Sequence, residues 1–108
     1  MNIDDFQLNA AKTAIYPKQF AIMYPSLGLS AEAGEVANKV KKIYRDKNGV
    51  LSPEAAKDIT SECSDVLWYL AALASDLGYK LSEIADMNTV KLQSRMERGV
   101  IQGSGDNR

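Results

Sequence analysis

The segment from Ser52 to Gly78 constrains the fold most strongly, because it carries both a start signal and a stop signal for a helix. Ser52 is a typical N-cap residue, Pro53 fits the first helical position, and Glu54 follows it. Gly78 is typical of the residue that comes directly after a helix. The segment therefore predicts one uninterrupted helix from Pro53 to about Leu77.

The rest of the chain also shows helical signals, and no segment has the sustained alternation of a strand. Three further helices are predicted, over residues 3–15, from 27–30 to 46, and over 82–99. Pro17 and Pro25 are expected to break the chain on either side of a short turn. We therefore expect an all-α fold, an antiparallel four-helix-type bundle in a single domain over residues 1–108, with an irregular tail over residues 100–108.

Composition argues against several classes of protein. With 13 basic and 14 acidic residues the net charge is −1, whereas a protein that coats nucleic acid carries a basic excess. Cys63 is the only cysteine, so no intrachain disulfide can form and a reducing cytoplasm is expected. The N-terminal sequence MNIDDFQLN lacks the features of a signal peptide, and the most apolar run, Val66 to Ala74, is too short to span a bilayer. These observations predict a cytoplasmic protein with no membrane or nucleic-acid partner.

Four acidic residues form two matched pairs, Glu32 with Glu35 and Glu62 with Asp65. Each pair is spaced i, i+3 within a predicted helix, so each helix can present two carboxylates on one face. Clustered carboxylates repel one another and resist desolvation, and a divalent cation between them would offset this cost. The chain has no histidine, and an all-oxygen site suits Mg²⁺ or Mn²⁺. Because Mg²⁺ often binds substrate phosphates as well, the pattern indicates phosphate chemistry.

With their surroundings, these residues resemble the MazG-like family of nucleoside triphosphate pyrophosphohydrolases, which has an all-α fold. The family motif reads Glu-Glu-x-x-Glu, then a variable spacer, then Glu-x-x-Asp. In this chain the matching residues are Glu32, Glu35, Glu62 and Asp65, with a spacer of 26 residues. The stretches LGLSAEAGEVANKVKK, DVLWYLA and MNTVKLQSR extend the resemblance over nearly the whole chain. Ala31 stands where the motif has its first Glu, and we expect this departure to weaken binding of a second metal ion without abolishing activity.

The resemblance implies Mg²⁺-dependent hydrolysis of a nucleoside or deoxynucleoside triphosphate between its α- and β-phosphates, giving a nucleoside monophosphate and pyrophosphate. It implies that the same four carboxylates bind the metal and carry the catalysis, with one of them or a metal-bound hydroxide as the base. It also implies that Asn88 and Lys91, on one face of the last helix, contact phosphate, where the sequence alone leaves open a solvated polar face. Arg95 lies one turn beyond Lys91 and can extend this strip. The expected role is sanitation of the nucleotide pool or control of dNTP levels, in a homodimer or homotetramer with the nucleotide pocket at a subunit boundary.

Several of these candidates have a second interpretation that the sequence leaves open. Glu35 can instead form a surface ion pair with Lys39 at i, i+4. Lys39 and Lys42 can reach a polyphosphate, or they can be ordinary basic residues near the C-terminus of a helix. Trp68 shares a helix face with Asp65 and can stack on a base, or it can pack in the core or in a subunit interface. The tail can close the site or stay disordered, and the whole chain can instead be a non-catalytic helical interaction module.

Overall fold

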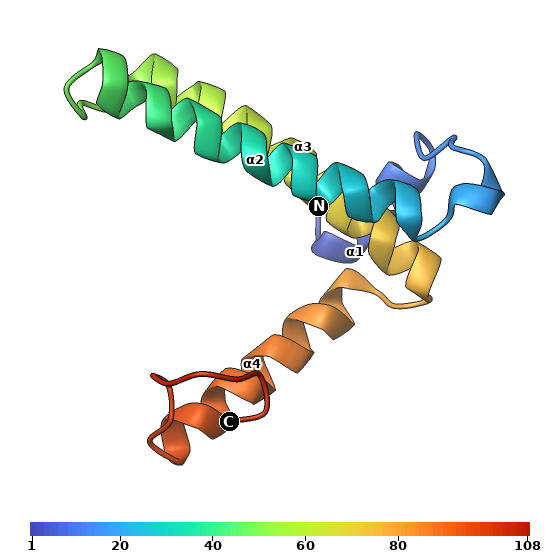
Figure 1. The fold of residues 1–108 in the computed structure, drawn as a ribbon. Coiled ribbons are helices and arrows are strands. Elements are labelled where there is room, and N and C mark those ends of the chain that lie inside the picture. The colour runs from blue at the N-terminus through green and yellow to red at the C-terminus, as the bar shows by residue number, and fades with distance from the viewer.

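The computed structural model describes residues 1–108 as four α-helices and one short 3₁₀ helix, with no strand (Figure 1). In chain order the elements are α1 (Ile3–Ala11), η1 (Lys18–Phe20), α2 (Met23–Asp46), α3 (Pro53–Leu77) and α4 (Leu81–Glu97). The predicted all-α class is thus confirmed. No helix of the chain combines the length and the apolar character that a membrane crossing needs.

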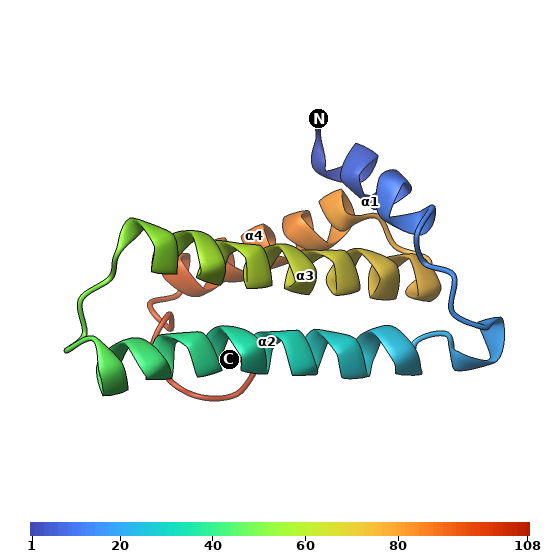
Figure 2. The same cartoon turned by 90° about the horizontal axis from the view of Figure 1, so that it is seen from above.

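Helices α2 and α3 form a long antiparallel hairpin that dominates the molecule (Figures 1 and 2). Helix α1 packs across the C-terminal half of α3, close to the start of α4. From there α4 leans away from the hairpin, so that its C-terminal end and the tail lie apart from α1 (Figure 1). The hairpin therefore supplies the antiparallel part of the predicted bundle, while one face of α4 is left uncovered within the single chain.

The small core lies where α1, α3 and α4 meet, and alanines allow these helices to approach closely. Ala10, Ala71, Ala74 and Leu81 form its buried cluster. Gln7 is buried beside it, and its side-chain amide donates to the carbonyl of Tyr79 at 2.9 Å while its Oε1 accepts from the backbone N–H of Leu81 at 2.8 Å. Gln7 thereby satisfies backbone groups at the start of α4, which would otherwise be left without partners inside the protein.

The helix boundaries with strong local signals lie where the sequence predicts them. Ser52 Oγ accepts a hydrogen bond from the backbone N–H of Ala55 at 3.1 Å, and Pro53 begins α3. Gly78 ends α3 in the left-handed conformation, with a φ of 81°. Asn48 and Gly49, which follow the end of α2, also have positive φ, at 54° and 75°. These positions confirm the long α2–α3 hairpin that carries the acidic pairs.

Two predicted boundaries near the prolines are wrong. Helix α1 ends at Ala11 instead of residue 15, because the chain turns there toward Pro17 and the hydroxyl of Tyr16 reaches Asp76 on α3 at 2.8 Å. Pro25 does not break the chain, because α2 already begins at Met23 and Pro25 lies in its first turn. The backbone nitrogens of a first helical turn have no partner within the helix, so a proline there removes no hydrogen bond.

The chain is much more extended than a compact domain of its length. Its radius of gyration is 16.8 Å, whereas a compact chain of this size is expected at about 13 Å. Only nine of the 108 residues are buried. Large apolar side chains stand exposed on α2 and α4, among them Leu27, Tyr44, Met87, Val90 and Met96. So much exposed apolar surface indicates an interaction surface.

Candidate metal centre

Three of the four predicted carboxylates converge between α2 and α3. Glu32 from α2 and Glu62 and Asp65 from α3 each offer one carboxylate oxygen, and these oxygens all lie within 4.8 Å of one another. Glu32 and Glu62 are half-buried, and Asp65 is exposed. The antiparallel pairing of two long helices creates this acidic cluster of Glu32, Glu62 and Asp65, because it places the i, i+3 pair of α3 opposite the start of the acidic segment of α2.

The electrostatics of the acidic cluster favour a bound cation. Loss of hydration raises the pKa of the Glu32 carboxyl above its ordinary value. The neighbouring carboxylates of Glu62 and Asp65 raise this pKa further, and so does Glu35. Negative groups that disfavour one another's charge are the arrangement that a divalent cation stabilises, and an all-carboxylate donor set fits Mg²⁺ or Mn²⁺.

Glu35 is not among the three converging carboxylates. It lies one turn beyond Glu32 on α2, and its side chain is exposed. Its charge still acts on Glu32 and on Lys39. The structure therefore places Glu35 at the edge of the acidic cluster.

Lys39 reaches from α2 to the acidic cluster. Its ammonium group lies 3.1 Å from Glu62 Oε1, and both side chains are partly shielded from water. The hydrogen bond to Glu62 raises the pKa of Lys39 above its ordinary value. The sequence left open a pair between Lys39 and Glu35 on one helix, but the ion pair instead joins α2 to α3, so one carboxylate of the cluster already has a cationic partner.

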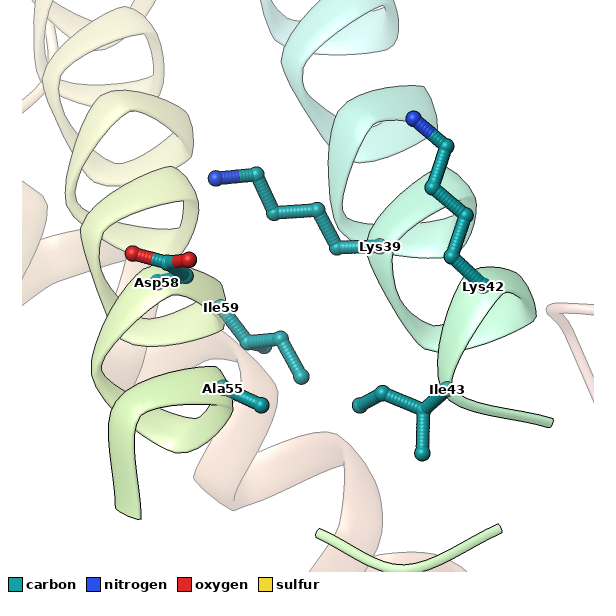
Figure 3. A pocket seen from close by; sticks show the side chains of 6 residues that line it. All are labelled: Lys39, Lys42, Ile43, Ala55, Asp58 and Ile59. Carbon is teal, nitrogen blue, oxygen red and sulfur yellow. The ribbon is translucent and has the colours of Figure 1, made fainter. Parts of the chain in front are cut away.

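Lys39 and Lys42 also line a cavity of about 260 Å³ between the same two helices (Figure 3). Its other lining residues are Ile43, Ala55, Asp58 and Ile59. Figure 3 shows Lys39 extending from α2 toward α3, with Ile43 facing Ile59 below it. The two lysines thus present positive charge beside the acidic cluster, with an apolar floor on the side away from it.

A second cavity, of about 360 Å³, opens on the other side of the acidic cluster and is lined by Thr13, Glu32, Asp65, Trp68 and Tyr69. The indole N–H of Trp68 donates to the hydroxyl of Thr13 at 2.8 Å, which fixes the ring against the loop after α1. Tyr69 stands edge-on to Trp68, with 5.0 Å between the ring centroids. The structure therefore brings the predicted Trp68 next to two of the acids.

Sequence reasoning assigned no role to Thr13 or Tyr69, which line this second cavity, or to Gly28, which packs against the ring of Tyr69. A Cβ built on Gly28 would lie 2.1 Å from the ring of Tyr69, so the absence of a side chain on α2 makes room for that ring. Tyr69 is four residues after Asp65, a spacing that places both on one helix face and could have identified it. Thr13 comes from a distant part of the chain and has no comparable local signal.

The predicted phosphate contacts on α4 are not brought to the acidic cluster within one chain, because α4 leans away from the hairpin (Figure 1). Asn88 is exposed on α4. Lys91 and Arg95 pair instead with Asp106 of the tail, at 3.0 and 3.2 Å from its Oδ1. The positive strip predicted on this helix is therefore present, but its charges are met by the chain's own C-terminal segment.

Comparison with known proteins adds an independent observation. The sequence model of the family described as the MazG nucleotide pyrophosphohydrolase domain matches residues 26–100. This range contains Glu35, the three residues of the acidic cluster and the strip on α4. The chain is also similar to the Gene 37 protein of Mycobacterium phage L5, with 51% identity over 114 residues that cover the whole of both chains. No solved structure matches the chain.

Proposed function

Because the chain belongs to the MazG nucleotide pyrophosphohydrolase family, we propose that it hydrolyses nucleoside or deoxynucleoside triphosphates between the α- and β-phosphates in the presence of Mg²⁺, for which Mn²⁺ can substitute. The products are a nucleoside monophosphate and pyrophosphate. One observation carries the proposal, namely the convergence of Glu32, Glu62 and Asp65 between two antiparallel helices. The biological role that fits is sanitation of the nucleotide pool or control of dNTP levels.

In this proposal the acidic cluster and Glu35 have separate tasks. Glu32, Glu62 and Asp65 would hold the metal, and Glu35 at the edge would complete the set or orient a water molecule. A bound Mg²⁺ neutralises polyphosphate charge and makes a water molecule more nucleophilic. Since the chain has no histidine, the base would be a carboxylate of this group or a metal-bound hydroxide.

Basic and aromatic residues on either side of the acids would position the nucleotide. Lys39 and Lys42 lie toward one end of the hairpin and can bind phosphate oxygens as point charges. Trp68 and Tyr69 lie on the other side, where an aromatic surface suits a nucleobase. This order along α2 and α3 matches the order of the parts of a nucleotide, with the scissile phosphates near the acidic cluster.

We propose a homodimer or homotetramer in which a second copy completes the site. The extended shape and the exposed apolar side chains on α2 and α4 support association. A second copy is also the available source of the α4 strip of Asn88, Lys91 and Arg95, which lies away from the acidic cluster of its own chain. Light scattering after size exclusion tests this part of the proposal, which a monomer at micromolar concentration would overturn.

The proposed substrate is a free nucleotide in the cytoplasm, with residues 1–108 acting as one domain. The near-neutral balance of charge disfavours nucleic acid as the partner. Cys63 is an exposed free thiol, which fits a reducing compartment.

The test is release of pyrophosphate from a panel of NTPs and dNTPs, with and without Mg²⁺, by the wild type and by Glu62→Gln. We expect metal-dependent release that the substitution reduces by at least about 100-fold. Circular dichroism of both proteins separates loss of activity from loss of folding. Absence of release from every nucleotide by the folded protein would refute the enzymatic proposal and favour the alternative of a non-catalytic helical interaction module.

A further inference from the structure

The C-terminal tail is folded back on the end of α4 by the side chains of Arg98 and Arg108. The guanidinium of Arg108 donates to the carbonyls of Val100, Ile101 and Gly105, at 3.1, 2.8 and 2.7 Å. Arg98 donates to the backbone carbonyl oxygen of Arg108. Gly105 has a φ of 88°, a left-handed conformation that lets the chain turn back here. Residues 98–108 therefore form a defined loop that returns to α4 (Figure 1).

This loop places one carboxylate between two cations of α4. Asp106 Oδ1 lies 3.0 Å from Lys91 Nζ and 3.2 Å from a guanidinium nitrogen of Arg95. Arg95 also donates to the backbone carbonyl of Asp106. The Arg95 side chain is 8% exposed, whereas the Asp106 side chain is 76% exposed. The hydrogen bonds of the buried Arg95 guanidinium thus go to Asp106, which itself stands open to solvent.

We propose that Asp106 occupies the position of a substrate phosphate, so that the folded tail competes with the polyphosphate of the nucleotide for Lys91 and Arg95. This inference rests on the proposed function, in which these two residues bind phosphate. Carboxylate and phosphate oxygens accept the same charge-assisted hydrogen bonds from lysine and arginine. A single carboxylate faces two cations here, so a polyphosphate with several negative charges is the stronger partner.

The way the tail is held supports its displacement. Lys91, Arg95 and Arg98 bind the tail through hydrogen bonds and ion pairs, Asp106 is solvent-exposed, and residues 101–107 are exposed along the chain. Segments held by exposed hydrogen bonds without apolar burial open at low free-energy cost. A ligand that binds only the open form has an apparent affinity equal to its intrinsic affinity multiplied by the fraction of molecules in the open form.

The alternative for the same contacts is structural support, in which Asp106 holds Arg95 in place for the substrate. The two interpretations make opposite predictions for Asp106→Asn. Competition predicts tighter binding of a polyphosphate, because the substitution weakens the closed form. Support predicts weaker binding, because it loosens Arg95.

The test is calorimetric titration of inorganic tripolyphosphate, without metal, into the wild type, Asp106→Asn and Asp86→Asn. Asp86→Asn is the control, because it changes the net charge by the same amount as Asp106→Asn. Asp86 lies on α4 and forms no ion pair. We expect Asp106→Asn to bind about 3- to 10-fold more tightly than the wild type, and Asp86→Asn to change binding by less than about 2-fold. Adding Lys91→Ala to Asp106→Asn should remove the gain. Equal or weaker binding by Asp106→Asn than by Asp86→Asn overturns the inference, as does absence of binding by all the proteins.

Hydrogen exchange supplies a second readout that follows the tail directly. Backbone amides of residues 98–108 should exchange faster when tripolyphosphate is bound to the wild type, because the tail is displaced. Slower exchange on binding would show that the tail closes over the ligand and would overturn competition. Neither readout needs catalysis, so the two proposals can fail separately. Tighter binding of tripolyphosphate by Asp106→Asn, in a protein that hydrolyses no nucleotide, would refute the enzymatic proposal alone. Metal-dependent hydrolysis together with unchanged binding by Asp106→Asn would refute the tail inference alone.

Discussion

Gly28 on α2 should be far less tolerant of alanine than Gly34 on the same helix. A Cβ on Gly28 would lie 2.1, 2.4 and 2.5 Å from three ring carbons of Tyr69, whereas a Cβ on Gly34 would have no neighbour within 4 Å. Non-bonded carbon atoms are stable at about 3.5–4.0 Å. The ring of Tyr69 must therefore move by more than an ångström or α2 must separate from α3.

The comparison of the two glycines isolates the steric contribution. Alanine in place of a helical glycine gains about 0.5–1 kcal/mol from backbone entropy at either position. This gain cancels between the two variants, and overpacking at Gly28 costs about 1–3 kcal/mol. We expect Gly34→Ala to raise the melting temperature and Gly28→Ala to fall at least about 4 °C below it.

Thermal unfolding at one fixed protein concentration measures this difference, since association makes the melting temperature depend on concentration. Tyr69→Ala provides the control, because Gly28→Ala should become stabilising once the ring is gone. In the catalytic assay Gly28→Ala should also lower pyrophosphate release, because Tyr69 lines the cavity that contains Glu32 and Asp65. Equal stabilisation by the two alanine variants in the presence of Tyr69 would falsify the packing argument.

Three further predictions test the acids and their partners. Lys39→Met should bind Mn²⁺ about 3- to 10-fold more tightly in calorimetry, because the substitution frees Glu62 to bind the metal, and its kcat/KM for the nucleotide should fall. Weaker Mn²⁺ binding would contradict competition between Lys39 and the metal for Glu62. Glu62→Gln and Lys91→Ala should each be inactive alone, but their mixture should recover about a quarter of wild-type activity if sites are shared across a twofold interface. About half of the dimers are then mixed, and one of the two sites in each mixed dimer has both wild-type residues, so no recovery would refute a shared site. The hydrogen bonds from Ser82 lower the pKa of Asp4. The contribution of Asp4 to the stability of the fold is therefore complete above the ordinary pKa of about 3.9, and it is lost as pH falls through the lowered pKa. Urea unfolding of Asp4→Asn should therefore depend less on pH below about 4 than that of the wild type, and parallel curves would contradict this.

Local signals predicted the fold where a single residue type determines the backbone. Ser52, Pro53 and Gly78 define α3 because capping, a fixed φ and a left-handed turn are properties of those residues themselves. The start of α2 was misjudged because a proline is unfavourable inside a helix but harmless in its first turn, and the sequence does not say which turn it occupies. The end of α1 depends on Asp76, 60 residues from Tyr16, which no local pattern reveals.

In the candidate site, too, the features that depend on local spacing could be predicted, and those that depend on tertiary contacts could not. The i, i+3 spacing predicted that the acids of each helix share a face, and antiparallel pairing then brings three of them together. The pairing of Lys39 with Glu62 depends on the register between α2 and α3, which spacing alone does not give. The contacts of Asp106 depend on a chain reversal at Gly105, so the predicted phosphate residues Lys91 and Arg95 are partnered in a way that only the folded tail shows.

Three of the cations proposed for phosphate, Lys39, Lys91 and Arg95, are paired with an acid of the same chain. Lys39 pairs with Glu62 of the acidic cluster, and Lys91 and Arg95 pair with Asp106. Glu62 can accept a metal fully only when Lys39 releases it, and the released ammonium is then available for a phosphate oxygen. Metal and polyphosphate should therefore each increase the affinity of the protein for the other, by the same factor, as thermodynamic linkage requires. Lys39 contributes part of this factor, so the coupling between metal and polyphosphate should be smaller in Lys39→Met than in the wild type. Asp106→Asn should leave the coupling unchanged, because Asp106 pairs with no residue of the acidic cluster.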